Sequence, residues 1–195
     1  MLKERILEYI HDYSEQNGEN IALFPEEKEY AQKHELLDVP LVDMEANLRF
    51  SDAYIERCDK ETENMIRIES SDFLTQPLVY LHKRQNEFIY IESKWFDIVQ
   101  VEAISLELDD VFKTYDVMLG LKLQKKFSAS IREYLQSHLN GENANFDLIF
   151  SNDDGLWNLN FALNDLNGFD ENMTIGEGYQ LIYRFLFEMI AELEK

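Results

Sequence analysis

Apolar residues at the start of the chain recur every three or four positions, which is the spacing of one face of an α-helix. The residues that carry this pattern are Leu2, Ile6, Tyr9, Ile10 and Tyr13. Gly18 follows, at a place where helices commonly end. A second helix is expected from Pro25 to Leu36, because proline suits the first helical position and two glutamates follow it at the positive end of the helix.

From about residue 49 the pattern changes to the alternation of apolar and polar residues that is typical of β-strands. Short polar segments separate the first four alternating segments, so they are expected to form two hairpins. The expected strands cover residues 49–59, 64–70, 77–83, 87–93, 103–110 and 115–124. The alternation predicts an antiparallel sheet with one covered face.

The stretch FDLIFSNDDGLWNLNFALNDL, residues 146–166, predicts one more hairpin. Asp153, Asp154 and Gly155 are residue types that favour its tight turn. The spacing does not fit a calcium-binding loop, because neither nearby glycine places a glutamate at the twelfth position. After the turn, large apolar residues alternate with asparagines that face either water or a partner. These are Asn158, Asn160 and Asn164.

Two helices are expected in the last third of the chain, over residues 127–139 and from about Thr174 to the C-terminus. The last helix is apolar on more than one side, whereas a helix with one buried face needs a single stripe. Either the protein's own core or a second subunit covers the additional sides. In the second case, a homodimer interface would contain Tyr183, Phe187 and Ile190.

This order of elements predicts an α+β protein with an antiparallel meandering sheet, helices packed mainly on one face and a long C-terminal helix. Composition favours a single domain over residues 1–195, since no linker or repeat interrupts the chain. The helical part, residues 1–45, is either integral to this domain or a loosely attached subdomain. The order of elements resembles that of bacterial secretion chaperones and toxin-neutralising immunity proteins, which implies protein binding but assigns no residue.

Charge narrows the choice of partner. The chain has 18 basic and 39 acidic residues and a formal charge of −21. Nucleic acid and anionic membranes are therefore unexpected partners, because both repel a strongly acidic surface. The most apolar stretch, residues 181–193, is too short to span a bilayer. We expect a cytoplasmic protein without a cofactor.

One segment reverses the charge. Residues 117–132 contain no aspartate or glutamate, and their basic residues gather where the helix over residues 127–139 is expected to begin. A helix N-terminus attracts anions. The segment is therefore either an ordinary solvated corner or the anion-binding site of a small-molecule sensor or enzyme, which would take a phosphate or carboxylate ligand. The ligand-binding residues would be Lys125, Lys126, Ser128, Ser130 and Arg132.

A third interpretation is a metal-dependent hydrolase. Glu92 and Lys94 lie two apart on an expected strand, so both side chains would project from one face. With an upstream carboxylate such as Asp72, this spacing resembles a metal-dependent nuclease pattern. No other catalytic motif is found, and Cys58 has no neighbouring base. The sequence thus favours a non-catalytic protein-binding or adaptor module over an enzyme.

Overall fold

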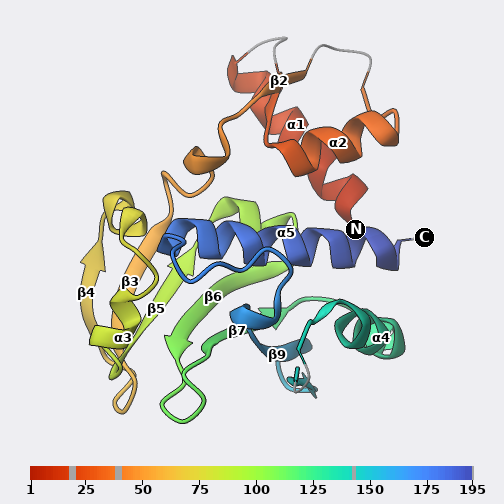
Figure 1. Cartoon of the computed structure of the whole chain (residues 1–195). Coiled ribbons are helices and arrows are strands. Elements are labelled where there is room, and N and C mark those ends of the chain that lie inside the picture. The colour runs from red at the N-terminus through yellow and green to blue at the C-terminus, as the bar shows by residue number, and fades with distance from the viewer. Residues whose placement is uncertain (18–20, 38–40, 142–143, 195) are drawn as a thin grey trace.

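The computed structural model describes residues 1–17, 21–37, 41–141 and 144–194. Within these residues the chain forms five α-helices and nine β-strands, joined by short 3₁₀ helices (Figure 1). The N-terminal elements are α1 (Leu2–Asn17), β1 (Ile21–Leu23), α2 (Pro25–Lys33), β2 (Leu41–Asp43) and η1 (Ala46–Leu48). The middle elements are β3 (Tyr54–Asp59), β4 (Met65–Glu69), η2 (Ser71–Thr75), α3 (Tyr80–Lys83), β5 (Glu87–Glu92), η3 (Lys94–Asp97), β6 (Val101–Leu108) and β7 (Tyr115–Leu121). The last elements are η4 (Lys125–Phe127), α4 (Ser128–His138), β8 (Phe146–Ser151), β9 (Leu156–Ala162), η5 (Leu163–Asp165) and α5 (Ile175–Leu193).

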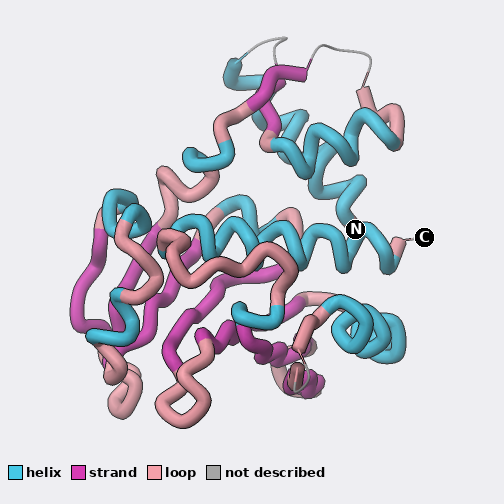
Figure 2. The backbone as a smooth tube through the Cα atoms, in the orientation of Figure 1, coloured by secondary structure: helices cyan, strands magenta, loops and turns pink. Residues whose placement is uncertain are grey.

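An antiparallel sheet of seven strands forms the body of the described chain, in the order β4-β3-β5-β6-β7-β9-β8. One face of its central strands is buried and the other is partly exposed, as the alternating burial of β6, β7 and β9 shows. Helices gather on the buried face, and strands lie together beneath them (Figure 2). The predicted α+β class with a one-sided helix layer is therefore confirmed.

The predicted hairpin over residues 146–166 is present as β8 and β9. Trp157, Leu159 and Phe161 are buried on the helix side of the sheet, while Asn158 and Asn160 are exposed on the other side. Gly155 adopts a φ of 70° in the turn, a conformation that glycine reaches without the steric penalty of a side chain. Both the alternation of apolar and polar residues and the residue types of the turn predict this hairpin.

The prediction of a strand over residues 77–83 is wrong, because this segment turns into α3. Leu78 and Leu81 are both fully buried. A strand would place residues three apart on opposite faces, whereas a helix places them on one. Two further differences lie in the N-terminal part of the chain. Helix α2 ends at Lys33, before the expected Leu36, and the short parallel pair of β1 and β2 is not expected from the sequence. Gly18, the expected end of the first helix, lies outside the described residues.

Helix α5 lies between the sheet and the N-terminal helices (Figure 1). On the sheet side, the hydroxyl of Tyr179 donates to the carbonyl of Ile89 at 3.0 Å. On the other side, Tyr30 of α2 meets Phe187 edge to face with ring centroids 5.9 Å apart. A capping box at Thr174 and Glu177 fixes the start of the helix, as the chemistry of its first turn favours. None of the helices in the described parts of the chain has the length and apolar character needed to cross a membrane.

A buried ion pair joins the N-terminal helices to the rest of the protein. Both N–H arms of the Arg49 guanidinium donate to the Glu27 carboxylate, at 2.7 and 3.0 Å, and one also donates to Glu26 at 2.6 Å. Glu27 and Arg49 are 0% and 2% exposed. The hydroxyl of Tyr183 on α5 donates to the same Glu27 carboxylate. The rings of Tyr183 and Phe24 enclose the guanidinium, with their centroids 4.0 and 4.2 Å from Arg49 Cζ. Burial alone would lower the pKa of Arg49, but Tyr183 and the two carboxylates raise it overall, so the guanidinium is charged.

The two chain ends add a second connection. Glu194, just after α5, accepts a hydrogen bond from the backbone N–H of Leu2 at 2.8 Å and from the Tyr30 hydroxyl at 2.7 Å. Its carboxylate also lies 2.8 Å from the N-terminal ammonium of Met1. These contacts, together with the Glu27–Arg49 pair, are what a loosely attached N-terminal part would have to break.

We predict that replacing Arg49 by methionine lowers the free energy of unfolding by about 3–5 kcal/mol, because it leaves the Glu27 charge buried without its partner. Urea denaturation measures this loss. In a triple variant (Glu27→Leu, Arg49→Met, Tyr183→Phe) no fully buried polar group of the cluster is left unpaired, since Glu26, which also loses Arg49, is 24% exposed to water. Most of the loss should therefore be recovered. A triple variant less stable than Arg49→Met would contradict this account.

Candidate functional site

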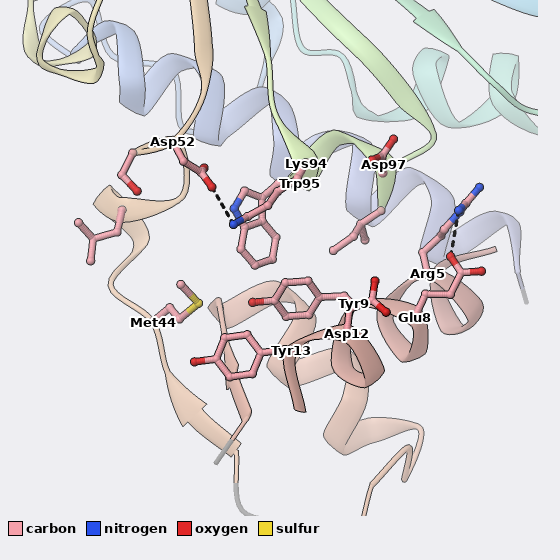
Figure 3. Close-up of a pocket in the computed structure, with 13 residues that line it drawn as sticks. Arg5, Glu8, Tyr9, Asp12, Tyr13, Met44, Asp52, Lys94, Trp95 and Asp97 are labelled. Atoms are coloured by element: carbon pink, nitrogen blue, oxygen red, sulfur yellow. Dashed lines mark hydrogen bonds and ion pairs between the residues drawn. The ribbon is translucent and has the colours of Figure 1, made fainter. Parts of the chain in front are cut away.

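A cleft of about 610 Å³ opens between α1, the segment that joins β2 to β3, and η3 (Figure 3). Three segments distant in the sequence form its walls. Helix α1 contributes Arg5, Glu8, Tyr9, Asp12 and Tyr13; the connecting segment contributes Met44, Leu48, Ser51 and Asp52; and η3 with the residue after it contributes Lys94, Trp95, Asp97 and Ile98. We call this feature the acid–aromatic cleft.

Aromatic rings form the inner part of the acid–aromatic cleft. Tyr9 packs against Trp95 with ring centroids 4.8 Å apart, and Tyr13 follows one helical turn later, 5.8 Å from Tyr9. Figure 3 shows both tyrosines extending from α1 toward Met44, with Tyr9 next to Trp95 of η3. The ring of Phe24 packs edge to face against Trp95. Ser93 caps η3, because its hydroxyl accepts a hydrogen bond from the backbone N–H of Trp95. Burial raises the pKa of Tyr9, so its phenol stays neutral.

Carboxylates outnumber cations around the acid–aromatic cleft. Arg5 pairs with Glu8 at 2.9 Å, and Lys94 pairs with Asp52 at 2.7 Å (Figure 3). Each cation of the lining is therefore neutralised by a neighbour. Asp12 and Asp97 supply the surplus negative charge. Asp12 Oδ1 lies 3.7 Å from Nδ1 of the neighbouring His11. A concave surface with tyrosine rings and surplus carboxylates suits a cation rather than an anion.

The predicted anion-binding residues come together at the start of α4, beside the β8–β9 turn. Two of the basic residues form hydrogen bonds within the chain. Lys125 Nζ donates to Asn152 Oδ1 at 3.1 Å, and Arg132 donates to the carbonyl of Leu148 at 2.6 Å. Lys126 Nζ lies 5.0 Å from the ring centroid of its neighbour Phe127. Ser128 is the first residue of α4, whereas Ser130 is exposed on its first turn. Binding of an anion there stays a prediction.

The residues of the hydrolase interpretation do not share a strand, so that geometric expectation is wrong. Strand β5 ends at Glu92, and Lys94 begins η3. Glu92 accepts a hydrogen bond from the Tyr90 hydroxyl at 2.7 Å, whereas Lys94 is paired with Asp52. Within the described residues, no group of three or more histidine, cysteine, aspartate or glutamate side chains is arranged to hold a metal ion.

The three residues predicted for a homodimer interface lie inside the chain. Tyr183, Phe187 and Ile190 are 0%, 5% and 0% exposed. The N-terminal helices and the sheet cover them from opposite sides, which accounts for the several apolar stripes of α5. These side chains leave almost no surface for a second chain to contact.

The three asparagines predicted to face water or a partner have different surroundings. Asn164 accepts the backbone N–H of Tyr115 at 2.7 Å and thereby ties β7 to the end of β9. Asn158 and Asn160 are exposed on the helix-free face of the sheet, beside a shallow hollow that also contains Met118. Asn164 is therefore structural, and the other two face the surface.

Sequence reasoning missed the acid–aromatic cleft because its residues come from three segments. The spacing of Tyr9 and Tyr13 indicates one face of a helix and nothing about a cleft, and Trp95 follows a strand without any motif of its own. Comparison with known proteins adds no assignment: no family model, no curated protein and no solved structure matches this chain.

The reactivity of the Cys58 thiol, which lies outside the acid–aromatic cleft, can be measured directly. Burial and the neighbouring Glu56 raise the pKa of its thiol to about 11. Because only the thiolate reacts, we predict that alkylation by iodoacetamide at about pH 8 is at least roughly 100-fold slower than that of free cysteine.

Glu56→Gln should accelerate this reaction, because it removes the neighbouring charge, and unfolding in urea should abolish the difference. Reaction of the folded protein at the rate of free cysteine would show that the Cys58 thiol is accessible and has an ordinary pKa, which would contradict the raised pKa.

Proposed function

We propose that this protein is a non-catalytic protein-binding module and that the acid–aromatic cleft accepts a basic segment of its partner. The observation that supports this most strongly is the charge arrangement around Tyr9 and Tyr13. The two cations of the lining are already paired, while Asp12 and Asp97 add negative charge on opposite walls. An incoming arginine or lysine thus meets both carboxylates and π faces.

The chemistry of arginine fits this arrangement best. Its planar guanidinium can lie against a tyrosine ring while its N–H groups donate to a carboxylate. Each such contact contributes about 0.5–2 kcal/mol, depending on how far it is desolvated. Several contacts are needed for useful affinity, and an extended segment with more than one basic residue provides them.

The charge of the whole molecule supports the same partner. With a formal charge of −21, the protein attracts a basic chain from a distance and accelerates the encounter. Attraction of this kind weakens as salt is added. We place the interaction in the cytoplasm, in keeping with a chain whose single cysteine is a free thiol.

We predict that a short acetylated and amidated peptide of alternating arginine and glycine binds the acid–aromatic cleft, as measured by isothermal titration calorimetry. The double variant Asp12→Asn, Asp97→Asn should weaken binding about tenfold, which corresponds to about 1.4 kcal/mol. Tyr13→Leu should also weaken binding, because it removes a π face while keeping an apolar side chain.

A control with the same net charge separates a specific site from general attraction. The variant Asp147→Asn, Asp153→Asn removes two exposed carboxylates on β8 and its turn, far from the cleft in sequence. It should change affinity by less than about twofold, since exposed charges are screened over short distances. Equal weakening by both double variants would contradict the proposed site.

A further inference from the structure

We propose that β4 is a second interaction surface and that its occupant is β4 of another copy of this chain. The two strands would pair antiparallel, so that the large sheets of two molecules become continuous. Strand β4 lies at the edge of the sheet, apart from the N-terminal helices (Figure 1), and it contributes no residue to the acid–aromatic cleft. The proposal is therefore independent of the proposed function.

Strand β4 exposes large apolar side chains. Met65, Ile66 and Ile68 are 52%, 46% and 52% exposed, and Tyr54 on the adjoining β3 is 40% exposed. Within the described residues, β4 pairs only with β3, so one row of its backbone N–H and C=O groups is free to pair. Proteins that remain monomeric usually protect such an edge, because an apolar edge strand readily pairs with another strand.

The opposite edge of the sheet shows the contrast. There, Arg132 of α4 donates to the backbone carbonyl of Leu148, so a side chain occupies part of the edge of β8. In the described parts of the chain, no side chain binds the backbone of β4 in this way. The β3–β4 hairpin is also preorganised, since Asp59 accepts both the backbone N–H and the hydroxyl of Thr62 in its turn, at 2.9 and 2.8 Å.

Charge selects the register of the pair. In a two-fold antiparallel pair, residues that lie opposite each other are on the same face of the sheet. One residue of β4 therefore lies opposite its own copy, with the symmetry axis midway between the two. An axis at Arg67 would place two arginines opposite each other, which is unfavourable. An axis at Ile68 instead places Arg67 opposite Glu69 of the other copy, twice, and brings the two Ile68 side chains together.

The side chains can make these contacts. Arg67 is 69% exposed and lies 3.7 Å from Glu69 of its own strand, so it can reach across the edge. Glu69 also accepts from Arg57 at 2.7 Å, which fixes its carboxylate in place. This self-complementarity of charge and apolar contact favours a second copy over an unrelated strand. Because the paired segment is short, the interface is smaller than the standard size, and a weak dimer is expected.

Sedimentation equilibrium of the full chain tests the proposal. The weight-average mass should rise from 23.2 kDa toward twice that value between about 1 and 300 µM, the range of a small interface. Ile68→Lys should hold the protein at the monomer mass. The matched change Ile149→Lys, at an exposed position on the other edge strand, should leave the association unchanged.

Disulfide trapping tests the register. Ile68→Cys should give a covalent dimer under mild oxidation, because residues directly opposite across a two-fold pair lie close enough for a disulfide. Ile149→Cys and Ile66→Cys should give much less. The proposal is overturned if the wild-type chain stays monomeric throughout this range, or if Ile68→Lys and Ile149→Lys affect association equally. Equal cross-linking of the three cysteine variants would overturn the register.

Discussion

The pairing of Glu27 with Arg49 is the interaction on which the arrangement of this protein depends. Both charges are removed from water, and neither can be left alone without a large penalty. A buried ion pair contributes little net stability compared with apolar residues of the same shape, but it strongly disfavours any arrangement in which the partners separate. The pair therefore fixes the orientation of the N-terminal helices against α5. Tyr183 reinforces this orientation, because its hydroxyl binds the same carboxylate and its ring lies against the guanidinium.

This orientation has two structural consequences. The N-terminal helices cover the sides of α5 that the sheet cannot reach, which is why α5 is apolar almost all round. They also place α1 next to η3, so that Tyr9 meets Trp95 and the acid–aromatic cleft forms between them. The same buried cluster touches Trp95 from the interior, with Arg49 Cζ 5.4 Å from the indole ring centroid. The shape of the cleft thus depends on contacts that lie behind it.

Features that depend on neighbouring residues could be predicted from the sequence, whereas features that depend on contacts between distant segments could not. The hairpin of β8 and β9 and the helix α5 were predicted because alternation, turn residues and helical spacing are local properties. The segment around Leu78 and Leu81 is too short for its period to decide between strand and helix. Glu27 looked like an ordinary acidic residue in the first turn of a helix, since nothing nearby in the chain reveals that Arg49 will reach it. The cleft and the buried pair both require knowledge of which distant segments meet.

Two surfaces of different character result from this architecture. The acid–aromatic cleft is concave and acidic, which suits a basic partner, whereas the edge at β4 is apolar and self-complementary, which suits a second copy. The cleft depends on the docking of the N-terminal helices against α5 through the Glu27–Arg49 pair. Native-state hydrogen exchange of wild-type and Arg49→Met proteins tests it most directly. In the variant, the amides of α1 and α2 should lose more protection than those of β6, β7 and β9, whose protection falls only with the global free energy of unfolding. Equal loss of protection in all these elements, or none in α1 and α2, would contradict the account.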